Sequence, residues 1–83
     1  MLITDEFKLI IAVENILIDN IDVYYKDGKV ISGFLKEVKF IPFGITICKH
    51  KNNNEENYNH FLEFDKANKV KINYLRGKIR EFV

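Results

Sequence analysis

The sequence predicts a mainly β fold, a small barrel of five or six strands preceded by an N-terminal α-helix, in one domain over residues 1–83. Two features lead to this prediction. Asp27-Gly28 separates two runs of strand-forming residues, and glycine accepts the positive φ that a tight hairpin turn needs. Gly33 lies inside the second run, where a glycine usually marks a bulge or a sharp bend. A sharply bent second strand is typical of small barrels.

The N-terminal segment, residues 5–18, is predicted to be a helix. Thr4 would cap it, and Asp5 and Glu6 would lie at the positive end of its dipole. Two apolar stripes follow the helical period, so we expect cover on two sides, from the barrel and from a second subunit. One stripe contains Phe7, Ile10, Ile11, Glu14 and Leu17, and the other contains Leu9, Ala12, Val13 and Ile16. The β-branched residues of this segment leave a strand as the alternative.

Residues 21–83 are predicted to form the barrel. Each expected strand is a short run of β-branched and aromatic residues bounded by turn residues. The expected strands are 21–25, 29–40, 45–48, 60–64, 70–75 and 79–83. The stretch 51–59 is rich in Asn and Glu and is expected to be a polar loop, because such a tract cannot contribute to a core.

Composition restricts the environment and the partners. A hydrophobic fraction of 47% in 83 residues leaves room for an oligomer interface, so we expect a homo-oligomer. Cys48 is the one cysteine, which fits a reducing compartment and hence a cytoplasmic location. The longest mainly apolar stretch, 7–18, is short and interrupted by charge, so we expect no membrane partner. The net charge is +1, but residues 1–25 are acidic and residues 26–51 and 61–83 are basic.

No catalytic motif is present in the sequence, which contains neither a phosphate-binding loop nor a nucleophile turn. Cys48, His50 and His60 are too few for a typical zinc site. A cysteine in an apolar run such as that around Cys48 is more often a core residue than a nucleophile. We therefore expect a protein that is not an enzyme and that holds no metal and no cofactor.

Basic and aromatic residues occur together, which favours a nucleic-acid-binding module, RNA above all. Single strands bind through phosphate neutralisation and base stacking on aromatic rings. Phe40 and Phe43 flank Pro42 in an expected loop, where they would serve base stacking or a protein contact. The candidate nucleic-acid-binding residues are Lys26, Lys39, Phe40, Phe43, Arg76, Lys78 and Arg80. The alternative is a protein-interaction module or inhibitor that uses the acidic N-terminal segment or a free sheet edge.

Two short motifs resemble those of the Sm-like proteins, which include the RNA chaperone Hfq and archaeal Sm relatives. Residues 26–35 resemble the first motif of that family, in which two glycines are separated by four residues, as Gly28 and Gly33 are. Residues 75–79, Leu-Arg-Gly-Lys-Ile, resemble the second. The resemblance implies an Sm- or SH3-like barrel, a ring or smaller oligomer, and RNA binding with Arg76 at a base-binding position. The family carries an Asp and an Asn after the bent strand, and residues 38–44 contain neither.

Two weaker resemblances point to the same topology. The phrase Tyr-Tyr-Lys-Asp-Gly at residues 24–28 is similar to one in YolD-like proteins. The order of helix, Lys-Asp-Gly hairpin and Phe-Leu-Glu-Phe-Asp-Lys at residues 61–66 resembles the small antiterminators that inhibit the Rho factor. The second resemblance implies binding to a protein through a barrel edge and an acidic helix.

Overall fold

The computed structural model describes residues 1–49 and 59–83, and in them six antiparallel strands form a single sheet behind an N-terminal helix. The elements are α1 (Asp5–Glu14), η1 (Asn15–Leu17), β1 (Ile18–Tyr25), β2 (Val30–Phe40), β3 (Phe43–Cys48), β4 (Asn59–Glu63), η3 (Phe64–Lys66), β5 (Ala67–Tyr74) and β6 (Ile79–Phe82). The predicted mainly β class with an N-terminal helix is therefore confirmed.

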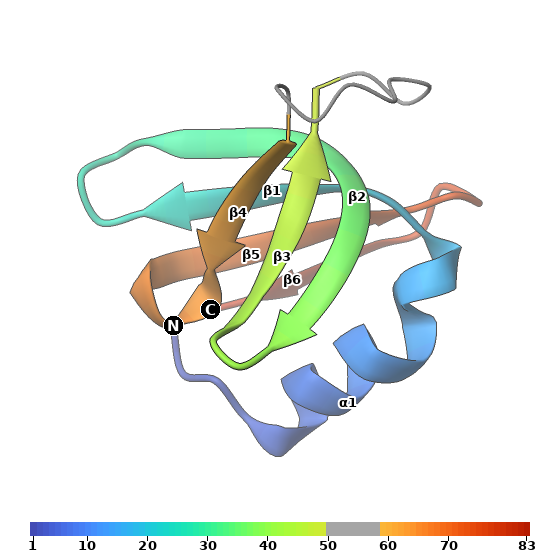
Figure 1. Cartoon of the computed structure of the whole chain (residues 1–83), viewed down its shortest axis with the longest axis horizontal. Coiled ribbons are helices and arrows are strands. Elements are labelled where there is room, and N and C mark those ends of the chain that lie inside the picture. The colour runs from blue at the N-terminus through green and yellow to red at the C-terminus, as the bar shows by residue number, and fades with distance from the viewer. Residues whose placement is uncertain (50–58) are drawn as a thin grey trace.

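The sheet is strongly curled, and its strand order is β4-β3-β2-β1-β5-β6. The long strand β2 bends over the molecule and pairs with β1 along its first half and with β3 along its second half (Figure 1). Within residues 1–49 and 59–83 no ladder joins the edge strands β4 and β6, so the sheet stays open. Helix α1 lies at one end of the curl, beside the strands that it helps to cover (Figure 1).

The hairpin turn between β1 and β2 forms where the sequence predicts it. Gly28 adopts a φ of 86°, which a side chain would disfavour. The Asp27 carboxylate accepts a hydrogen bond from the Lys29 backbone N–H at 2.9 Å, and this Asx-type contact supports the turn. Gly77, with a φ of 88°, plays the same part in the turn between β5 and β6.

Gly33 serves a purpose that differs in part from the predicted one. It pairs in regular register with Ile21, and the irregularity of β2 lies further on, between Leu35 and Glu37. A Cβ at position 33 would lie 2.8 Å from Cδ1 of Ile47 and 2.9 Å from the carbonyl oxygen of Cys48. The missing side chain thus allows β2 to fold closely onto β3, while the bulge further along the strand contributes to the bend.

Helix α1 begins as predicted and ends earlier. The Thr4 hydroxyl accepts a hydrogen bond from the Phe7 backbone N–H at 3.1 Å. The expected range of 5–18 is too long, because the Asn15 side chain donates to the carbonyl groups of Ile11 and Ala12 and so satisfies the last turn. Leu17, expected in the buried stripe, lies instead in the following 3-10 turn and is exposed.

The core lies between the concave face of the sheet and one face of the helix. Phe7 is fully buried, and its ring makes edge contacts with Phe43, Phe64 and Phe82 at centroid distances of 5.8, 5.0 and 4.8 Å. These rings come from β3, η3 and β6, so Phe7 connects the helix to both halves of the curl.

Several strand boundaries differ from the predicted ones by a few residues. β1 starts at Ile18 rather than at residue 21, and β5 starts at Ala67 rather than at residue 70, because the ladder between them continues to both ends. Phe43 belongs to β3 and not to a loop. Of the expected polar loop 51–59, residues 51–58 lie outside the described residues, and Asn59 begins β4.

Candidate interaction surfaces

One stripe of helix α1 faces away from the core. The side chains of Leu9, Val13 and Ile16 are 63%, 67% and 79% exposed, whereas Phe7, Ile10 and Ile11 on the opposite face are buried. The exposed residues follow a spacing of four and then three positions, so they form one continuous ridge that begins on α1 and ends at Ile16 in η1. Ala12 is exposed beside them.

The apolar surface continues beyond the end of the helix. Leu17 and Leu75 are 53% and 54% exposed, and the Leu75 backbone N–H donates to the Leu17 carbonyl at 2.9 Å. This bond fastens the start of the turn between β5 and β6 to η1, so the two leucines are neighbours. We call this combined surface the α1 patch: Leu9, Ala12, Val13, Ile16, Leu17 and Leu75.

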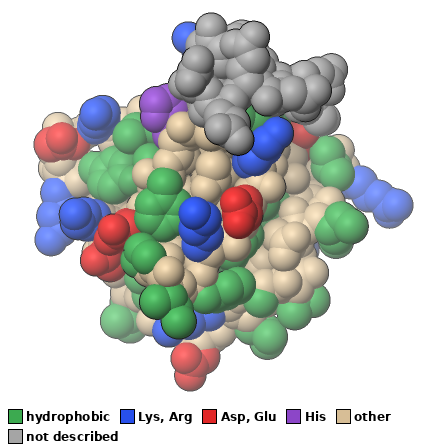
Figure 2. Space-filling view, in the orientation of Figure 1, with side chains coloured by type: hydrophobic (Ala, Val, Ile, Leu, Met, Phe, Trp, Pro, Cys, Tyr) green, Lys and Arg blue, Asp and Glu red, His purple; other side chains and the backbone are tan. Residues whose placement is uncertain are grey.

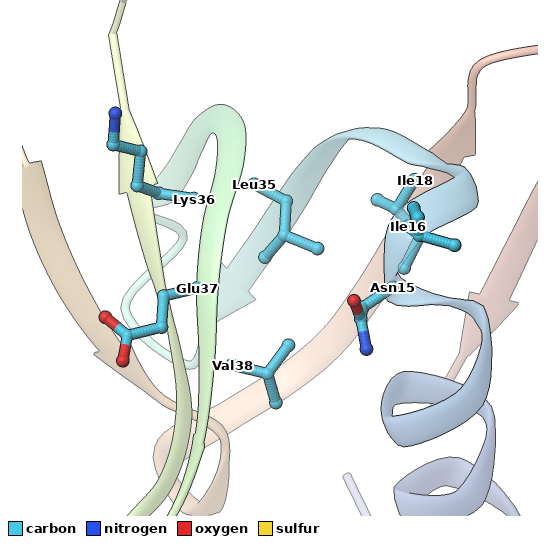
Figure 3. A pocket seen from close by; sticks show the side chains of 7 residues that line it. All are labelled: Asn15, Ile16, Ile18, Leu35, Lys36, Glu37 and Val38. Carbon is cyan, nitrogen blue, oxygen red and sulfur yellow. The ribbon is translucent and has the colours of Figure 1, made fainter. Parts of the chain in front are cut away.

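A groove of about 310 Å³ adjoins the α1 patch between the end of the helix and β2. Figure 3 shows Asn15, Ile16 and Ile18 on one side and the strand β2 on the other. The lining residues are Asn15, Ile16, Ile18, Leu35, Lys36, Glu37 and Val38. Because Ile16 belongs to both the α1 patch and the groove wall, a chain that covers the patch can also fill the groove.

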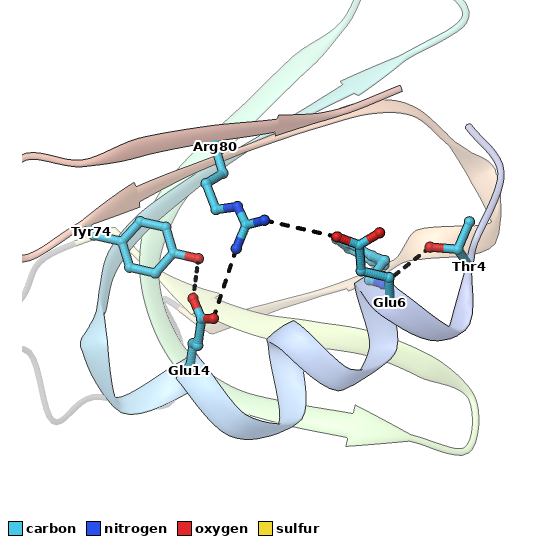
Figure 4. Close-up of polar contacts among 6 residues, drawn as sticks. Thr4, Glu6, Glu14, Tyr74 and Arg80 are labelled. Carbon is cyan, nitrogen blue, oxygen red and sulfur yellow. Dashed lines mark hydrogen bonds and ion pairs between the residues drawn. The ribbon is translucent and has the colours of Figure 1, made fainter.

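A polar cluster holds the other side of the helix against β5 and β6 (Figure 4). The Tyr74 hydroxyl donates to Oε1 of Glu14 at 2.7 Å. The Arg80 guanidinium lies 3.8 Å from Oε2 of Glu14 and 3.9 Å from Oε1 of Glu6. Burial, and after it the hydrogen bond to Glu14 and the charge of Glu14, raise the pKa of Tyr74 above its ordinary value. Arg80, a candidate nucleic-acid-binding residue, is thus engaged with the acidic side of the helix.

The predicted basic residues do not gather in one place. Lys26 lies in the turn between β1 and β2, whereas Arg76 and Lys78 lie in the turn between β5 and β6. Figure 1 shows these two turns at opposite ends of the sheet. The eight-residue strand β1 runs between them, a length of roughly 25 Å at about 3.3 Å per residue. A single phosphate site that uses all three residues is not formed.

The two candidate aromatic residues differ in exposure. Phe40 is 50% exposed, and its ring is stacked on that of Phe43 at a centroid distance of 5.5 Å. Phe43 is half-buried and contacts Phe64 at a centroid distance of 4.9 Å. The expectation of two exposed loop aromatics is therefore wrong for Phe43, because the core reaches the end of β3.

A basic-aromatic pair that sequence reasoning missed lies on the outer face of β2 and β4. The expected strand 60–64 predicts Phe61 near the core, but its side chain is 39% exposed. The Lys39 ammonium lies 5.6 Å from the centroid of the Phe61 ring. The alternation of side chains along a strand could have predicted this exposure. Leu62 in β4 and Phe64 directly after Glu63 are both buried, and Phe61, the residue before Leu62, points to the opposite face. Figure 2 shows that basic, acidic and apolar side chains alternate over this face.

Metal and membrane sites receive no support from the described residues. Within residues 1–49 and 59–83 no three His, Cys, Asp or Glu side chains come together as metal ligands, and His50 lies outside these ranges. Cys48 is buried at the end of β3, as its apolar surroundings in the sequence predict. No helix in the described part of the chain combines the length and the apolar character that a membrane crossing requires.

Comparison of the chain with family models, with curated proteins and with solved structures gives no match in any of the three. Function must therefore be argued from the surfaces described above.

Proposed function

We propose that this chain is a non-enzymatic protein-interaction module, in which another protein chain covers the α1 patch. One observation carries the proposal: Leu9 and Val13 of α1 and Ile16 of η1 are 63–79% exposed, whereas the opposite face of α1 is buried in the core. Contiguous exposed apolar surface marks interaction sites in proteins. Covering it contributes about 25 cal/mol for each Å² of apolar surface removed from water.

The surroundings of the α1 patch suit a protein partner. Interfaces combine an apolar centre with a polar rim. Here Leu35 and Val38 of β2 face Ile16 across the groove, and the charged side chains of Lys36 and Glu37 lie at its far edge (Figure 3). Asp5 and Glu6 at the start of the helix would repel a phosphate backbone, which disfavours nucleic acid on this side.

We further infer that the scaffold is an open Sm- or SH3-like barrel and that the protein works in the cytoplasm. The bent strand β2, the two-sided pairing of β1 with β2 and β5, and the Gly28–Gly33 spacing support the first inference. The single cysteine of the chain, the buried Cys48, supports the second, because small secreted domains usually depend on several disulfides.

A second candidate function is single-stranded nucleic-acid binding, RNA above all, on the outer face of β2 and β4. The observation that favours it is the exposed Phe61 ring with Lys39 beside it. Base stacking on one ring contributes roughly 1–3 kcal/mol, and the lysine adds a phosphate contact. Phe61→Ala should weaken binding of a labelled oligouridine at least fivefold at low salt, and Val30→Ala, at an exposed position at the start of β2, is the control. Equal affinity of wild type and Phe61→Ala would exclude this site.

The protein-interaction proposal is tested with a photo-cross-linking residue, p-benzoylphenylalanine, placed at Val13 or at Val30 in the cells that express the chain. Val30 is a matched control, because it is a 48% exposed valine at the start of β2. We expect discrete protein adducts from position 13 that survive nuclease treatment, and none of these from position 30. Leu9→Glu in the same chain should abolish them. Absence of protein adducts at position 13 would overturn the proposal.

A further inference from the structure

We propose that the chain that covers the α1 patch is a second copy of this chain, which binds in an antiparallel, two-fold symmetric dimer. The inference rests on the proposed function, because it names the protein that covers the patch. It is argued from charge complementarity between the two ends of the patch and from the size of the surface available.

The two ends of the α1 patch carry opposite charge. Asp5 lies one helical turn before Leu9, on the same side of α1 as Leu9 and Val13, and it is exposed. At the other end, Leu75 is bonded to Leu17 and leads directly into exposed Arg76. The patch is therefore a ridge with a carboxylate at one end and a guanidinium at the other.

A two-fold axis brings these opposite ends together. In an isologous interface, residue i contacts residue j and residue j contacts residue i. With the axis near Ala12 and Val13, Leu9 of one copy lies against Ile16 of the second copy. Asp5 is about 7.5 residues, roughly 11 Å at about 1.5 Å per residue, from this axis. It therefore lies beyond η1 of the second copy, on the side where Arg76 follows Leu75, and the pairing occurs twice. Leu9 and Ile16 of both copies form an apolar centre between the two pairs.

The side chains at the axis suit close helix packing. Ala12 is the smallest residue of the patch and lies between Leu9 and Ile16, so it leaves space for the facing helix. Packed helices approach to about 8–10 Å, depending on the side chains between them. A single small residue at the centre, with larger apolar residues on each side, allows the two ridges to interdigitate.

A dimer through the α1 patch has to bury surface beyond the exposed stripe of the helix. A standard interface buries ~800 Å² on each partner, which is about one seventh of the 5588 Å² exposed by this chain. The exposed helix stripe is too small to supply this alone. Leu17, Leu75 and the groove beside Ile16 extend it, and the groove receives Leu9 of the second copy.

Sedimentation equilibrium of the purified full chain, from about 1 to about 200 µM, tests the dimer. We expect a concentration-dependent monomer–dimer equilibrium. Val13→Glu should raise the dissociation constant at least a hundredfold, because each dimer carries the change twice, while Val30→Glu leaves it unchanged. A monomer at every concentration, together with retained protein adducts at position 13, would overturn the dimer and leave the proposed function standing. A monomer at every concentration without protein adducts at position 13 would overturn both the dimer and the proposed function.

A charge exchange tests the antiparallel arrangement. Asp5→Lys and Arg76→Glu should each weaken self-association at least tenfold, since each places like charges together at both ends. An equimolar mixture of the two variants should form a heterodimer with wild-type affinity. In it the introduced lysine meets the introduced glutamate at one end, and the native Arg76 meets the native Asp5 at the other. Circular dichroism confirms that each variant is folded. A mixture that associates no better than the single variants would overturn this arrangement.

Discussion

Gly44 lies in β3, and atoms of the neighbouring strand β4 fill the space that a side chain at this position would need. A Cβ at this position would clash with the carbonyl oxygen of Leu62 and would lie 2.7 Å from Cζ of Phe61. The carbonyl cannot move freely, because Gly44 pairs with Glu63 in the ladder between β3 and β4. The missing side chain of Gly44 thus leaves room for the edge of the Phe61 ring, which is exposed beside Lys39.

We therefore expect Gly44→Ala to destabilise the protein by about 2 kcal/mol, within the usual range for overpacking. Urea unfolding followed by circular dichroism measures the change. Ser32→Ala, at an exposed position of β2, is the control and should change the free energy of unfolding by less than about 0.5 kcal/mol. Equal stability of Gly44→Ala and wild type would show that β4 shifts at no cost.

Tyr74 makes stability depend on alkaline pH. Its pKa is raised above the ordinary 10.0, first by burial and then by Glu14, so the folded state holds the proton more tightly than the unfolded state. This contribution is fully present below pH 10.0 and is lost as the pH rises through the folded-state pKa. Tyr74→Phe should cost about 1 kcal/mol at neutral pH through the lost hydrogen bond. Its free energy of unfolding should fall less steeply than that of wild type from about pH 9 to about pH 11.

The measurement is urea unfolding at a series of pH values, for wild type and variant side by side. Tyr25, whose pKa is raised by burial, Asp65 and Glu63, is retained in both proteins and gives them a common alkaline decline. Parallel profiles for wild type and Tyr74→Phe would contradict the assignment to Tyr74.

At the scale of the element, helix α1 depends on its N-terminal cap. The Thr4 hydroxyl satisfies the Phe7 backbone N–H, and Asp5 and Glu6 occupy the first turn. Thr4→Ala should destabilise the protein by about 1 kcal/mol, whereas Thr4→Ser, which keeps the hydroxyl, should cost less than half of that. Thermal unfolding compares the two. A loss of equal size in both variants would assign the effect to the threonine methyl group rather than to the cap.

The same helix shows what the sequence could predict. Thr4 with Asp5 and Glu6 located its start, and the stripe that contains Phe7, Ile10 and Ile11 is buried; cover of the second stripe by another subunit stays a prediction. Its end was predicted at residue 18 instead of Glu14, because the pattern continues through Leu17 while Asn15 turns back onto the helix carbonyl groups. Such a side-chain cap depends on a rotamer, which apolar periodicity does not report.

For the strands, too, the sequence predicted the turns better than the burial of single side chains. Asp27-Gly28 and Arg76-Gly77 located two turns, because their glycines are needed for positive φ. Phe43 and Phe61 were assigned to the wrong environments. Which face of a strand is buried depends on partners distant in sequence. Phe43 packs against Phe7 of the helix, and the Phe61 ring lies over Gly44 of β3. Nor could the sequence show that the turn between β1 and β2, which contains Lys26, and the turn between β5 and β6, which contains Arg76, lie at opposite ends of the sheet.

At the scale of the whole molecule, the helix completes a sheet that does not close on itself. The described edge strands β4 and β6 are joined by no ladder, and the Phe7 ring fills the space between β3, η3 and β6. One side of α1 thus packs against both halves of the curled sheet, and the other side carries the helical part of the α1 patch. In the proposed dimer, folding and partner binding therefore depend on opposite faces of α1.

This division predicts opposite outcomes for two substitutions on one helix. Phe7→Ala should destabilise the monomer by about 3–5 kcal/mol, because the ring is fully buried and its loss leaves a cavity among three aromatic side chains. Leu9→Ala, two residues away and 63% exposed, should change monomer stability by less than about 0.5 kcal/mol. Chemical unfolding in dilute solution, where the chain is monomeric, measures both. At high concentration only Leu9→Ala should remain folded and yet lose self-association. Equal destabilisation by the two changes would show that the stripe is covered within the monomer, and it would remove the basis for an interaction surface on α1.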